Sequence, residues 1–154
     1  MATAISDTKE IEAVHAEWFA ANIGLQIDKM IGQFPEGDAY LQYNLNGLTY
    51  RGAHDKAKLW AGLKRVGSNI TSIEESGPVV VNVAGDIAWI AGEAIAQIVL
   101  PSPTGALGDT SVVPFRYTEI YRKDDNAGNP RWTIWHMHCS PSAPEDSTPK
   151  YGDE

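Results

Sequence analysis

The sequence has little cysteine, little positive charge and no long apolar run, and each shortage excludes a class of protein. Cys139 is the only cysteine in 154 residues, so an intrachain disulfide framework is excluded. Twelve Lys and Arg residues stand against 20 Asp and Glu, for a net charge of −8, which leaves no basic footprint for nucleic acid or an anionic membrane. No stretch approaches the roughly 20 apolar residues of a membrane span, and residues 1–7 lack the pattern of a secretory signal. We therefore expect a cytoplasmic protein with no nucleic-acid or membrane partner.

What is present fits one globular domain. Hydrophobic residues make up 43% of the chain and charged residues 21%, which is typical of a globular fold with a substantial core. We expect a short N-terminal extension over 1–6, a single folded domain over 7–144 and a flexible acidic tail over 145–154.

Two amphipathic helices are predicted in the first half of the chain. Asp7 and Glu10 resemble a capping box, and apolar residues then recur at steps of three and four. A second helix is predicted over 53–66, with Trp60 on its apolar stripe and its lysines, Lys56 among them, mostly on the other side. His15 lies at the edge of the first stripe. Both His15 and Trp60 are either core residues or contributors to a pocket.

Strands follow, first as a hairpin and then as a meander. Asn46-Gly47 favours a two-residue type I′ turn between strands over 39–45 and 48–51. That register puts Tyr43 and Tyr50 on one face, either in the core or with their hydroxyls in a pocket. Further strands are predicted over 70–76, 79–84, 87–100, 111–122 and 131–140. Helices followed by a run of strands indicate an α+β fold with helices on one face of a curved sheet.

The last predicted strand carries the densest set of aromatic and polar side chains. Because side chains alternate along a strand, His136 and His138 share one face, and Trp135, Met137 and Cys139 share the other. The histidines form a weak metal motif that lacks a third ligand. They serve either packing or acid–base chemistry. A β-bulge would exchange the two faces locally.

Charged residues interrupt the two strands before it. Glu93 stands within 87–100, and Arg116 and Glu119 stand within 111–122. A carboxylate among apolar residues is costly unless it is paired, hydrogen-bonded or protonated. These groups therefore form cross-strand pairs or line a pocket as acids and bases.

Two segments carry a resemblance to a known family. Residues 115–122 (Phe-Arg-Tyr-Thr-Glu-Ile-Tyr-Arg), followed by residues 132–140 (Trp-Thr-Ile-Trp-His-Met-His-Cys-Ser), resemble the nuclear transport factor 2-like superfamily in its SnoaL-like branch. Asp38-Ala39, Arg51-Gly52 and Gly85-Asp86 are similar to that family as well. The end of the last strand, with Pro141 after it, also resembles the association domain of calcium/calmodulin-dependent kinase II.

The resemblance implies a single α+β domain in which a cone-shaped, curved, mixed or antiparallel sheet wraps around the N-terminal helices. It further implies an apolar pocket, chemistry without metal or organic cofactor, and dimers formed through the convex sheet face. In the kinase association domain the residue corresponding to Cys139 faces the pocket. That correspondence would turn Trp135 and Met137 inward and the two histidines outward, so the orientation of this strand stays open.

Two functions fit these features. The first is an isomerase, lyase or cyclase that performs cofactor-independent acid–base chemistry on an apolar, cyclic or aromatic small molecule. The alternative is a non-catalytic ligand-binding or oligomerisation module. The catalytic candidates are His138, Glu93, His136 and Arg116. The candidates for substrate contact are Tyr43, Tyr50, Trp60, His15, Glu119, Trp135, Met137 and Cys139.

We also expect a homodimer. Large apolar residues occupy both faces of the predicted strands 87–100 and 131–140. One layer of helices covers only one face of a sheet, and large exposed apolar patches are unusual on a monomer.

Overall fold

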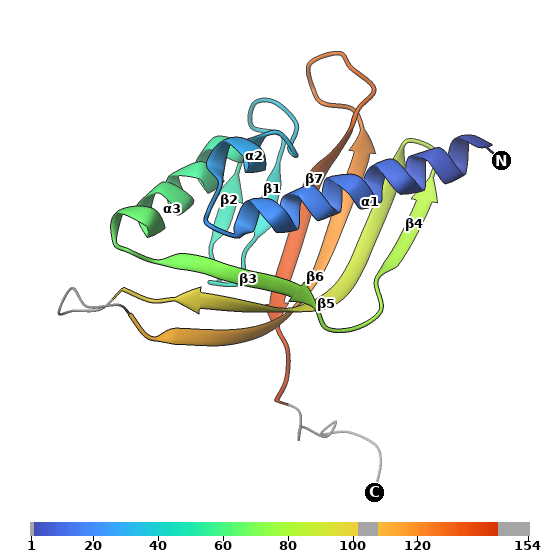
Figure 1. Cartoon of the computed structure of the whole chain (residues 1–154). Helices are drawn as coiled ribbons and strands as arrows, with labels where there is room; N and C mark the ends of the chain where they lie inside the picture. The colour runs from blue at the N-terminus through green and yellow to red at the C-terminus, as the bar shows by residue number, and fades with distance from the viewer. Residues whose placement is uncertain (1, 102–107, 145–154) are drawn as a thin grey trace, which may run out of the picture.

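The computed structural model describes residues 2–101 and 108–144. In this part of the chain, three helices cover one face of a seven-stranded sheet (Figure 1). None of these described helices is long and apolar enough to cross a membrane. The predicted tail, 145–154, lies outside the described residues. The helices are α1 (Ala2–Asn22), α2 (Ile27–Ile31) and α3 (Ala53–Arg65).

The sheet is mixed and open. Its strands are β1 (Leu41–Tyr43), β2 (Thr49–Arg51), β3 (Asn69–Glu75), β4 (Val80–Ala84), β5 (Ile87–Val99), β6 (Thr110–Lys123) and β7 (Trp132–Pro141). They run in the order β2-β1-β7-β6-β5-β3, with β4 also paired to β5. Only the β1–β7 pairing is parallel among the described strands. The predicted α+β fold is confirmed, and the strand ends differ from the prediction by at most two residues.

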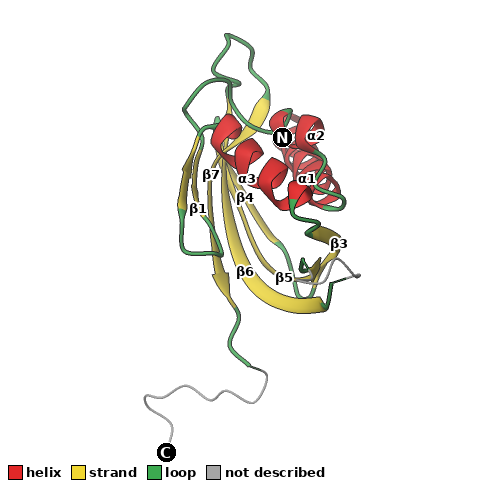
Figure 2. Ribbon diagram, turned by 90° about the vertical axis from the view of Figure 1, so that its left-hand side faces the viewer, coloured by secondary structure: helices red, strands yellow, loops and turns green. Residues whose placement is uncertain are grey.

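The two longest strands, β5 and β6, bend strongly, so the sheet forms a half-open cone around the helices (Figure 2). β4 pairs with the first half of β5 and β3 pairs with the second half. Gly92 lies between these halves, directly opposite Tyr117 of β6. A Cβ at Gly92 would lie 2.5 Å from the Tyr117 hydroxyl, so the missing side chain makes room for this ring.

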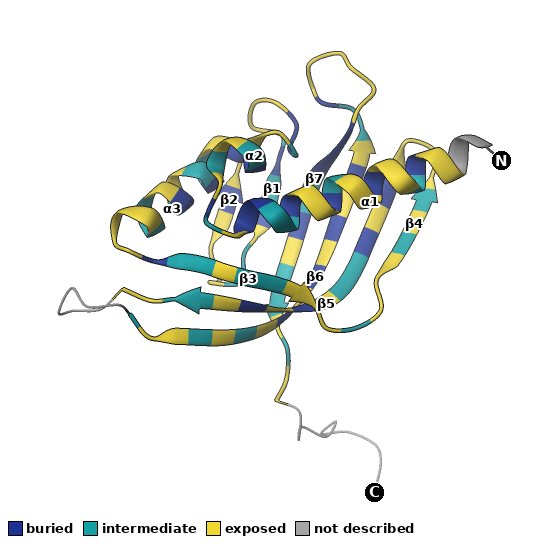
Figure 3. Ribbon diagram, viewed as in Figure 1, coloured by how far each residue is buried: buried dark blue, intermediate teal, exposed yellow. Residues whose placement is uncertain are grey.

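Helix α1 runs across the concave face and supplies much of the core. Buried and exposed residues alternate along the strands beneath it (Figure 3). Trp18 of α1 stacks on Trp60 of α3, with ring centroids 5.6 Å apart, and meets Phe34 edge-on at 5.3 Å. Such aromatic pairs add packing energy beyond the area that they bury.

The predicted start of α1 near Asp7 is wrong, because the helix begins at Ala2. The Asp7 carboxylate does not cap the helix. It accepts hydrogen bonds from Lys123 Nζ at 2.8 Å and Trp132 Nε1 at 3.0 Å. The hydrogen bond from Lys123 is the main cause of a lowered pKa for Asp7. Asp7 therefore fastens α1 to the sheet.

The predicted hairpin register is also wrong. β1 and β2 pair Gln42 with Tyr50 and Tyr43 with Thr49. Tyr43 is therefore 43% exposed on the outer face while Tyr50 is 8% exposed on the inner one. A type I′ turn needs positive φ at both central residues, but in this turn only Gly47 has positive φ. The Gly47 N–H donates to Asn44 O and the Asn44 N–H to Leu48 O, which gives a three-residue loop and shifts the register by one.

A β-bulge in β7 settles which side chains of the last strand face inward. Tyr121 pairs with Ile134, but Ile120 pairs with His136, so Trp135 is the extra residue. A bulge of this kind exchanges the two faces of a strand. Ile134 before the bulge and Met137 after it are both buried. Trp135 points outward, where Arg122 stacks over its ring at 4.2 Å.

We predict that Gly92→Ala destabilises the protein by about 1–3 kcal/mol, because the new methyl group overpacks against Tyr117. The measurement is the free energy of unfolding in urea. Gly62→Ala is the matched control, since a Cβ at this position of α3 meets no atom within 4 Å. That control should be neutral or stabilising by up to about 1 kcal/mol. Equal effects of the two substitutions would contradict the close approach of β5 and Tyr117.

Candidate active site

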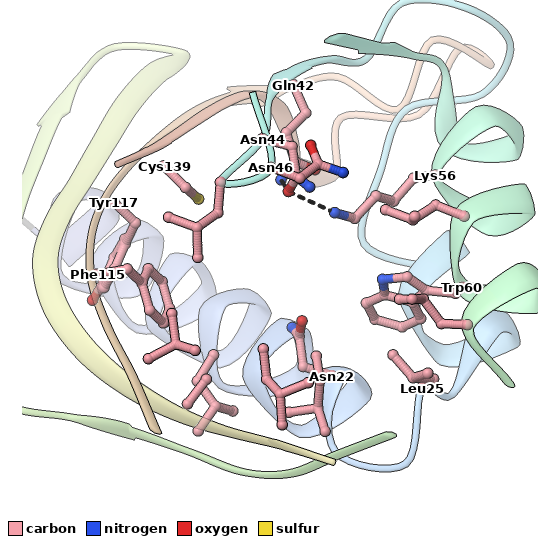
Figure 4. Close-up of a pocket in the computed structure, with 18 of the residues that line it drawn as sticks. Asn22, Leu25, Gln42, Asn44, Asn46, Lys56, Trp60, Phe115, Tyr117 and Cys139 are labelled. Atoms are coloured by element: carbon pink, nitrogen blue, oxygen red, sulfur yellow. Dashed lines mark hydrogen bonds between the residues drawn. The ribbon is translucent and has the colours of Figure 1, made fainter. Parts of the chain in front are cut away.

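The bent sheet, α1, α3 and the hairpin enclose a cavity of about 390 Å³ (Figure 4). Its size falls within the usual range for small-molecule sites, and its walls are mainly apolar and aromatic, as such sites require. The apolar lining includes Trp18, Phe19, Leu25, Leu59, Trp60, Leu63, Ile70, Ile73, Phe115 and Met137. One carboxylic acid, Glu119, and one lysine, Lys56, interrupt these walls.

Glu119 supplies a buried carboxylate. Its position on β6 turns it to the concave face together with Tyr117 and Tyr121, and its exposed fraction is 0%. Oε2 accepts a hydrogen bond from the Tyr121 hydroxyl at 2.5 Å and lies 2.8 Å from His15 Nδ1. Oε1 is buried and has no hydrogen-bond partner among the described residues. A buried acceptor of this kind is costly unless something else satisfies it.

His15 bridges two carboxylates. Its Nδ1 faces Glu119, and its Nε2 lies 2.7 Å from Glu75 Oε1. Burial alone would lower the pKa of His15, but the hydrogen bonds and negative charges of Glu119 and Glu75 outweigh it, so the pKa lies above 6.5. The imidazolium form donates one N–H to each carboxylate.

Tyr117 completes this network. Its hydroxyl donates to Glu75 at 2.8 Å, and its ring stacks on His15 with centroids 5.3 Å apart. Burial, followed by the hydrogen bond to Glu75, raises the pKa of Tyr117. The hydroxyl therefore stays protonated and remains a donor.

Lys56 supplies a buried amine at the hairpin side of the cavity (Figure 4). Its exposed fraction is 4%. Nζ donates to Asn44 Oδ1 at 3.0 Å and lies 5.3 Å from the centre of the Tyr50 ring. Asn44 Oδ1 also accepts from Gln42 Nε2 at 2.8 Å. Burial lowers the pKa of Lys56 to about 8, so a substantial neutral fraction exists near physiological pH.

Cys139 forms part of the wall. Burial raises the pKa of its thiol to about 12. A thiol becomes a good nucleophile only as the thiolate, so Cys139 acts as a small apolar side chain at neutral pH.

Several residues predicted for the site do lie at the cavity. Trp60, Glu119, Met137 and Cys139 line it. His15 lies directly behind Glu119. Tyr50 is packed behind Lys56 and accepts a hydrogen bond from Asn46 Nδ2 at 2.8 Å. The assignment of these residues to substrate contact stays a prediction.

The four catalytic candidates lie elsewhere, and their expected placement in the pocket is wrong. Glu93 pairs in register with Arg116, and both are exposed on the outer face of β5 and β6. His136 and His138 lie on the outer face of β7 because the bulge at Trp135 turns them outward.

The residues around the two histidines confirm that they belong to the outer face. Tyr43 packs edge-on against both imidazoles, with centroids 5.3 and 5.5 Å away, so it is not a cavity residue either. His136 Nδ1 lies 2.9 Å from Leu41 O and thereby joins β7 to β1. In the residues that the structure describes, no cluster of three or more His, Cys, Asp or Glu side chains is suited to a metal ion. Trp135, which was also predicted to contact substrate, is on the outside as well.

The sequence contained signals for two of the missed groups. Tyr117 and Tyr121, which were missed, alternate with outward residues along β6 in step with the predicted Glu119, and this spacing predicts one shared face. Lys56 precedes Trp60 by four residues, which is one helical turn, so both side chains lie on one face of α3. Glu75 carried no such signal, because its role depends on long-range packing of β3 against α1.

We predict that His15 titrates above 6.5, the ordinary value for histidine. The measurement is the pH dependence of its Cε1–H NMR signal. Glu75→Gln and Glu119→Gln should each lower the midpoint, because each removes a negative charge beside the ring.

The same titration has a consequence for stability. The folded state binds the His15 proton more tightly than the unfolded state does. The stabilisation by protonated His15 is therefore fully present below pH 6.5 and is lost as the pH rises through the folded-state pKa of His15. A midpoint below 6.5, or one that neither substitution moves, would contradict the described network.

The comparisons with known proteins identify the fold. No family model and no curated protein matches the chain. A nuclear transport factor 2 (NTF2-like) superfamily protein from Salmonella enterica serovar Typhimurium superimposes with a TM-score of 0.72 at 19% identity, covering 96% of this chain and 99% of that one. A ketosteroid isomerase-like protein from Erwinia carotovora atroseptica superimposes with a TM-score of 0.69 at 16% identity, covering 90% of this chain and 98% of that one.

A third structure, proposed to be a calcium/calmodulin-dependent kinase II association domain, comes from Exiguobacterium sibiricum. It gives a TM-score of 0.68 at 11% identity, covering 88% of this chain and 93% of that one. The narrower assignment to the SnoaL-like branch stays a prediction. At these identities the agreement concerns architecture, and the chain therefore has the NTF2-like fold that its sequence resemblance implied.

Proposed function

We propose that this protein is a cofactor-independent enzyme of the isomerase or lyase type, which transfers a proton to or from carbon in an apolar, cyclic or aromatic substrate. The observation that carries the proposal is the buried and unpartnered Oε1 of Glu119, in a side chain that lines an apolar cavity. The ketosteroid isomerase-like neighbour has the same fold, which is compatible with this chemistry but does not specify it.

Glu119 would act as the general base and then as the general acid. Oε1 takes a proton from a C–H next to a carbonyl group, and the electron pair of that bond moves onto the carbonyl oxygen. The protonated Glu119 returns its proton to a different carbon in an isomerisation, or to a departing hydroxyl group that leaves as water in a dehydration. Acid–base catalysis of this type contributes about 10²–10⁴-fold to a rate.

His15 and Tyr121 are positioning residues in this scheme. Both contact Oε2 of Glu119, so they fix the orientation of the carboxylate and leave Oε1 for the substrate. Glu75 and Tyr117 in turn hold His15. The apolar walls keep water away, which strengthens electrostatic interactions in the cavity.

The proposal predicts exchange of carbon-bound hydrogen. Wild-type protein in D₂O should speed the loss of the α C–H signals of a bicyclic ketone such as 2-tetralone, followed by ¹H NMR. Glu119→Gln keeps the shape of the side chain but removes the base, so it should slow this exchange at least about a hundredfold. A thermal unfolding scan shows whether the variant is folded.

Glu93→Gln is the matched control, because Glu93 is an exposed carboxylate on the neighbouring strand. It should exchange at the wild-type rate. If Glu93→Gln lost activity while Glu119→Gln retained it, the assignment of the base would be wrong. If folded wild-type protein accelerated exchange in none of a set of cyclic and aryl ketones, with and without a carboxylate substituent, the alternative of a non-catalytic ligand-binding module would replace this proposal.

We further propose that the protein is a homodimer joined through the outer face of the sheet. Trp89 of β5 and Ile120 of β6 are exposed there and are direct cross-strand neighbours, with Ile87 and Ile95 exposed further along β5. Burial of such a patch against a second copy removes apolar area from water. The neighbour proposed to be an association domain has this fold.

Light scattering at micromolar concentration should give twice the 16.8 kDa of the single chain. Trp89→Glu should shift the mass toward one chain, because it introduces a charge at the centre of the patch. A wild-type mass of 16.8 kDa that does not change with concentration would contradict the dimer.

A further inference from the structure

We infer that the ligand of this cavity carries a carboxylate, which Lys56 and Asn44 bind at the hairpin side while the apolar body of the ligand lies between the aromatic walls. The inference deepens the proposed function by naming the substrate class. It rests on that proposal only for the statement that the ligand is also the substrate.

The first observation is a buried cation that has no anionic partner. Lys56 is 4% exposed, yet no ion pair joins it to an acid in the described part of the chain. Its Nζ can donate three hydrogen bonds, and among the described residues it donates one, to Asn44 Oδ1. Charged groups in protein interiors are normally paired, so this arrangement lacks a negative charge.

The second observation is that the neighbouring acceptors are already occupied. Asn44 Oδ1 accepts from both Lys56 and Gln42, and Gln42 Oε1 accepts from the Tyr40 hydroxyl at 2.7 Å. These linked hydrogen bonds fix the orientation of the Asn44 amide group. Its Nδ2 then makes no hydrogen bond to any described residue. The hairpin side of the cavity therefore presents unused N–H donors from Lys56 and Asn44, while the nearby amide oxygens of Gln42, Asn44 and Asn46 each already accept a hydrogen bond, which favours an anion.

The lining indicates which anion. A single cation next to neutral amide donors matches the single charge of a carboxylate. The rest of the cavity is mainly apolar, with Trp18, Trp60 and Phe115 among its walls. Flat aromatic walls favour a flat hydrophobic ligand, and 390 Å³ has room for a bicyclic one.

Protonation of Lys56 should then depend on the ligand. Burial depresses the pKa of the free amine to about 8, and a bound carboxylate favours the charged form, which raises the pKa again. The titratable groups that face Lys56 from the packed strands are Tyr50 of β2 and Cys139 of β7. The pKa of Cys139 lies at about 12, so this thiol does not ionise between pH 7 and 9.5.

The test compares two ligands of the same shape, 2-naphthoate and the neutral 2-naphthamide, by isothermal titration calorimetry at pH 7. Wild-type protein should bind 2-naphthoate at least tenfold more tightly than 2-naphthamide. Lys56→Met keeps most of the apolar stem and removes the charge, so it should abolish this preference. Lys58→Met is the matched control, since Lys58 is an exposed lysine on the same helix, and it should keep the preference.

A pH series on wild-type protein gives the same information if Lys56→Met does not fold. Binding of 2-naphthoate should weaken at least tenfold between pH 7 and 9.5, because the amine loses its proton across its pKa of about 8. Binding of 2-naphthamide should stay constant over this range.

Three results would overturn the inference. They are no measurable binding of 2-naphthoate, equal binding of the two ligands by wild-type protein, and a carboxylate preference that survives in folded Lys56→Met. Glu119→Gln should bind 2-naphthoate at least as tightly as wild-type protein. A failure of the proposed proton transfer would therefore leave these binding results unchanged, and the two claims can fail separately.

Discussion

The bend in the β5–β6 pair is the constraint on which the rest of the structure depends. A straight helix cannot fill the concave side of a strongly curved sheet along its whole length. Helix α1 packs against β3, β4 and β7, and the cavity opens where the second half of β5 and the first half of β6 curve away from it, at Ala96, Ile98 and Phe115. Gly92 allows Tyr117 to lie close to β5 at this bend. The cavity is thus a geometric consequence of the fold, and its chemistry comes from the side chains that line it.

Glu119 and Lys56 give the cavity its chemical polarity, and burying either side chain costs desolvation free energy. Removing an ionised group from water costs free energy unless hydrogen bonds or an opposite charge replace the lost hydration. His15 and Tyr121 do this on one side of the Glu119 carboxylate. Asn44 and the Tyr50 ring replace only part of the hydration that the Lys56 amine loses on burial. What remains unsatisfied, one carboxylate oxygen and several N–H donors, is what a ligand with an acidic C–H and a carboxylate would satisfy.

The sequence predicted the elements well, but it did not predict their relative registers. Runs of apolar, β-branched and aromatic residues bounded by turn signals located every strand of the sheet within two residues. The faces of β7 could not be assigned, since the bulge at Trp135 arises from pairing with β6 and has no local signature. The hairpin prediction failed because the conformation of Asn46 decides between two turns that the same Asn-Gly pair can form. Lys56 was placed on the polar side of its helix because hydrophobicity alone cannot identify a lysine that the cavity buries.

A crystal structure of the complex with 2-naphthoate at pH 7 is the most direct test of the account. We expect electron density for the ligand inside the cavity. The carboxylate should lie about 2.7–3.2 Å from Lys56 Nζ, and the rings should lie between the aromatic walls around Trp18 and Trp60. The Oε1 atom of Glu119 should remain free of protein hydrogen bonds. Density for the carboxylate on the outer face beside His136 and His138, or a cavity filled by its own side chains, would contradict the account.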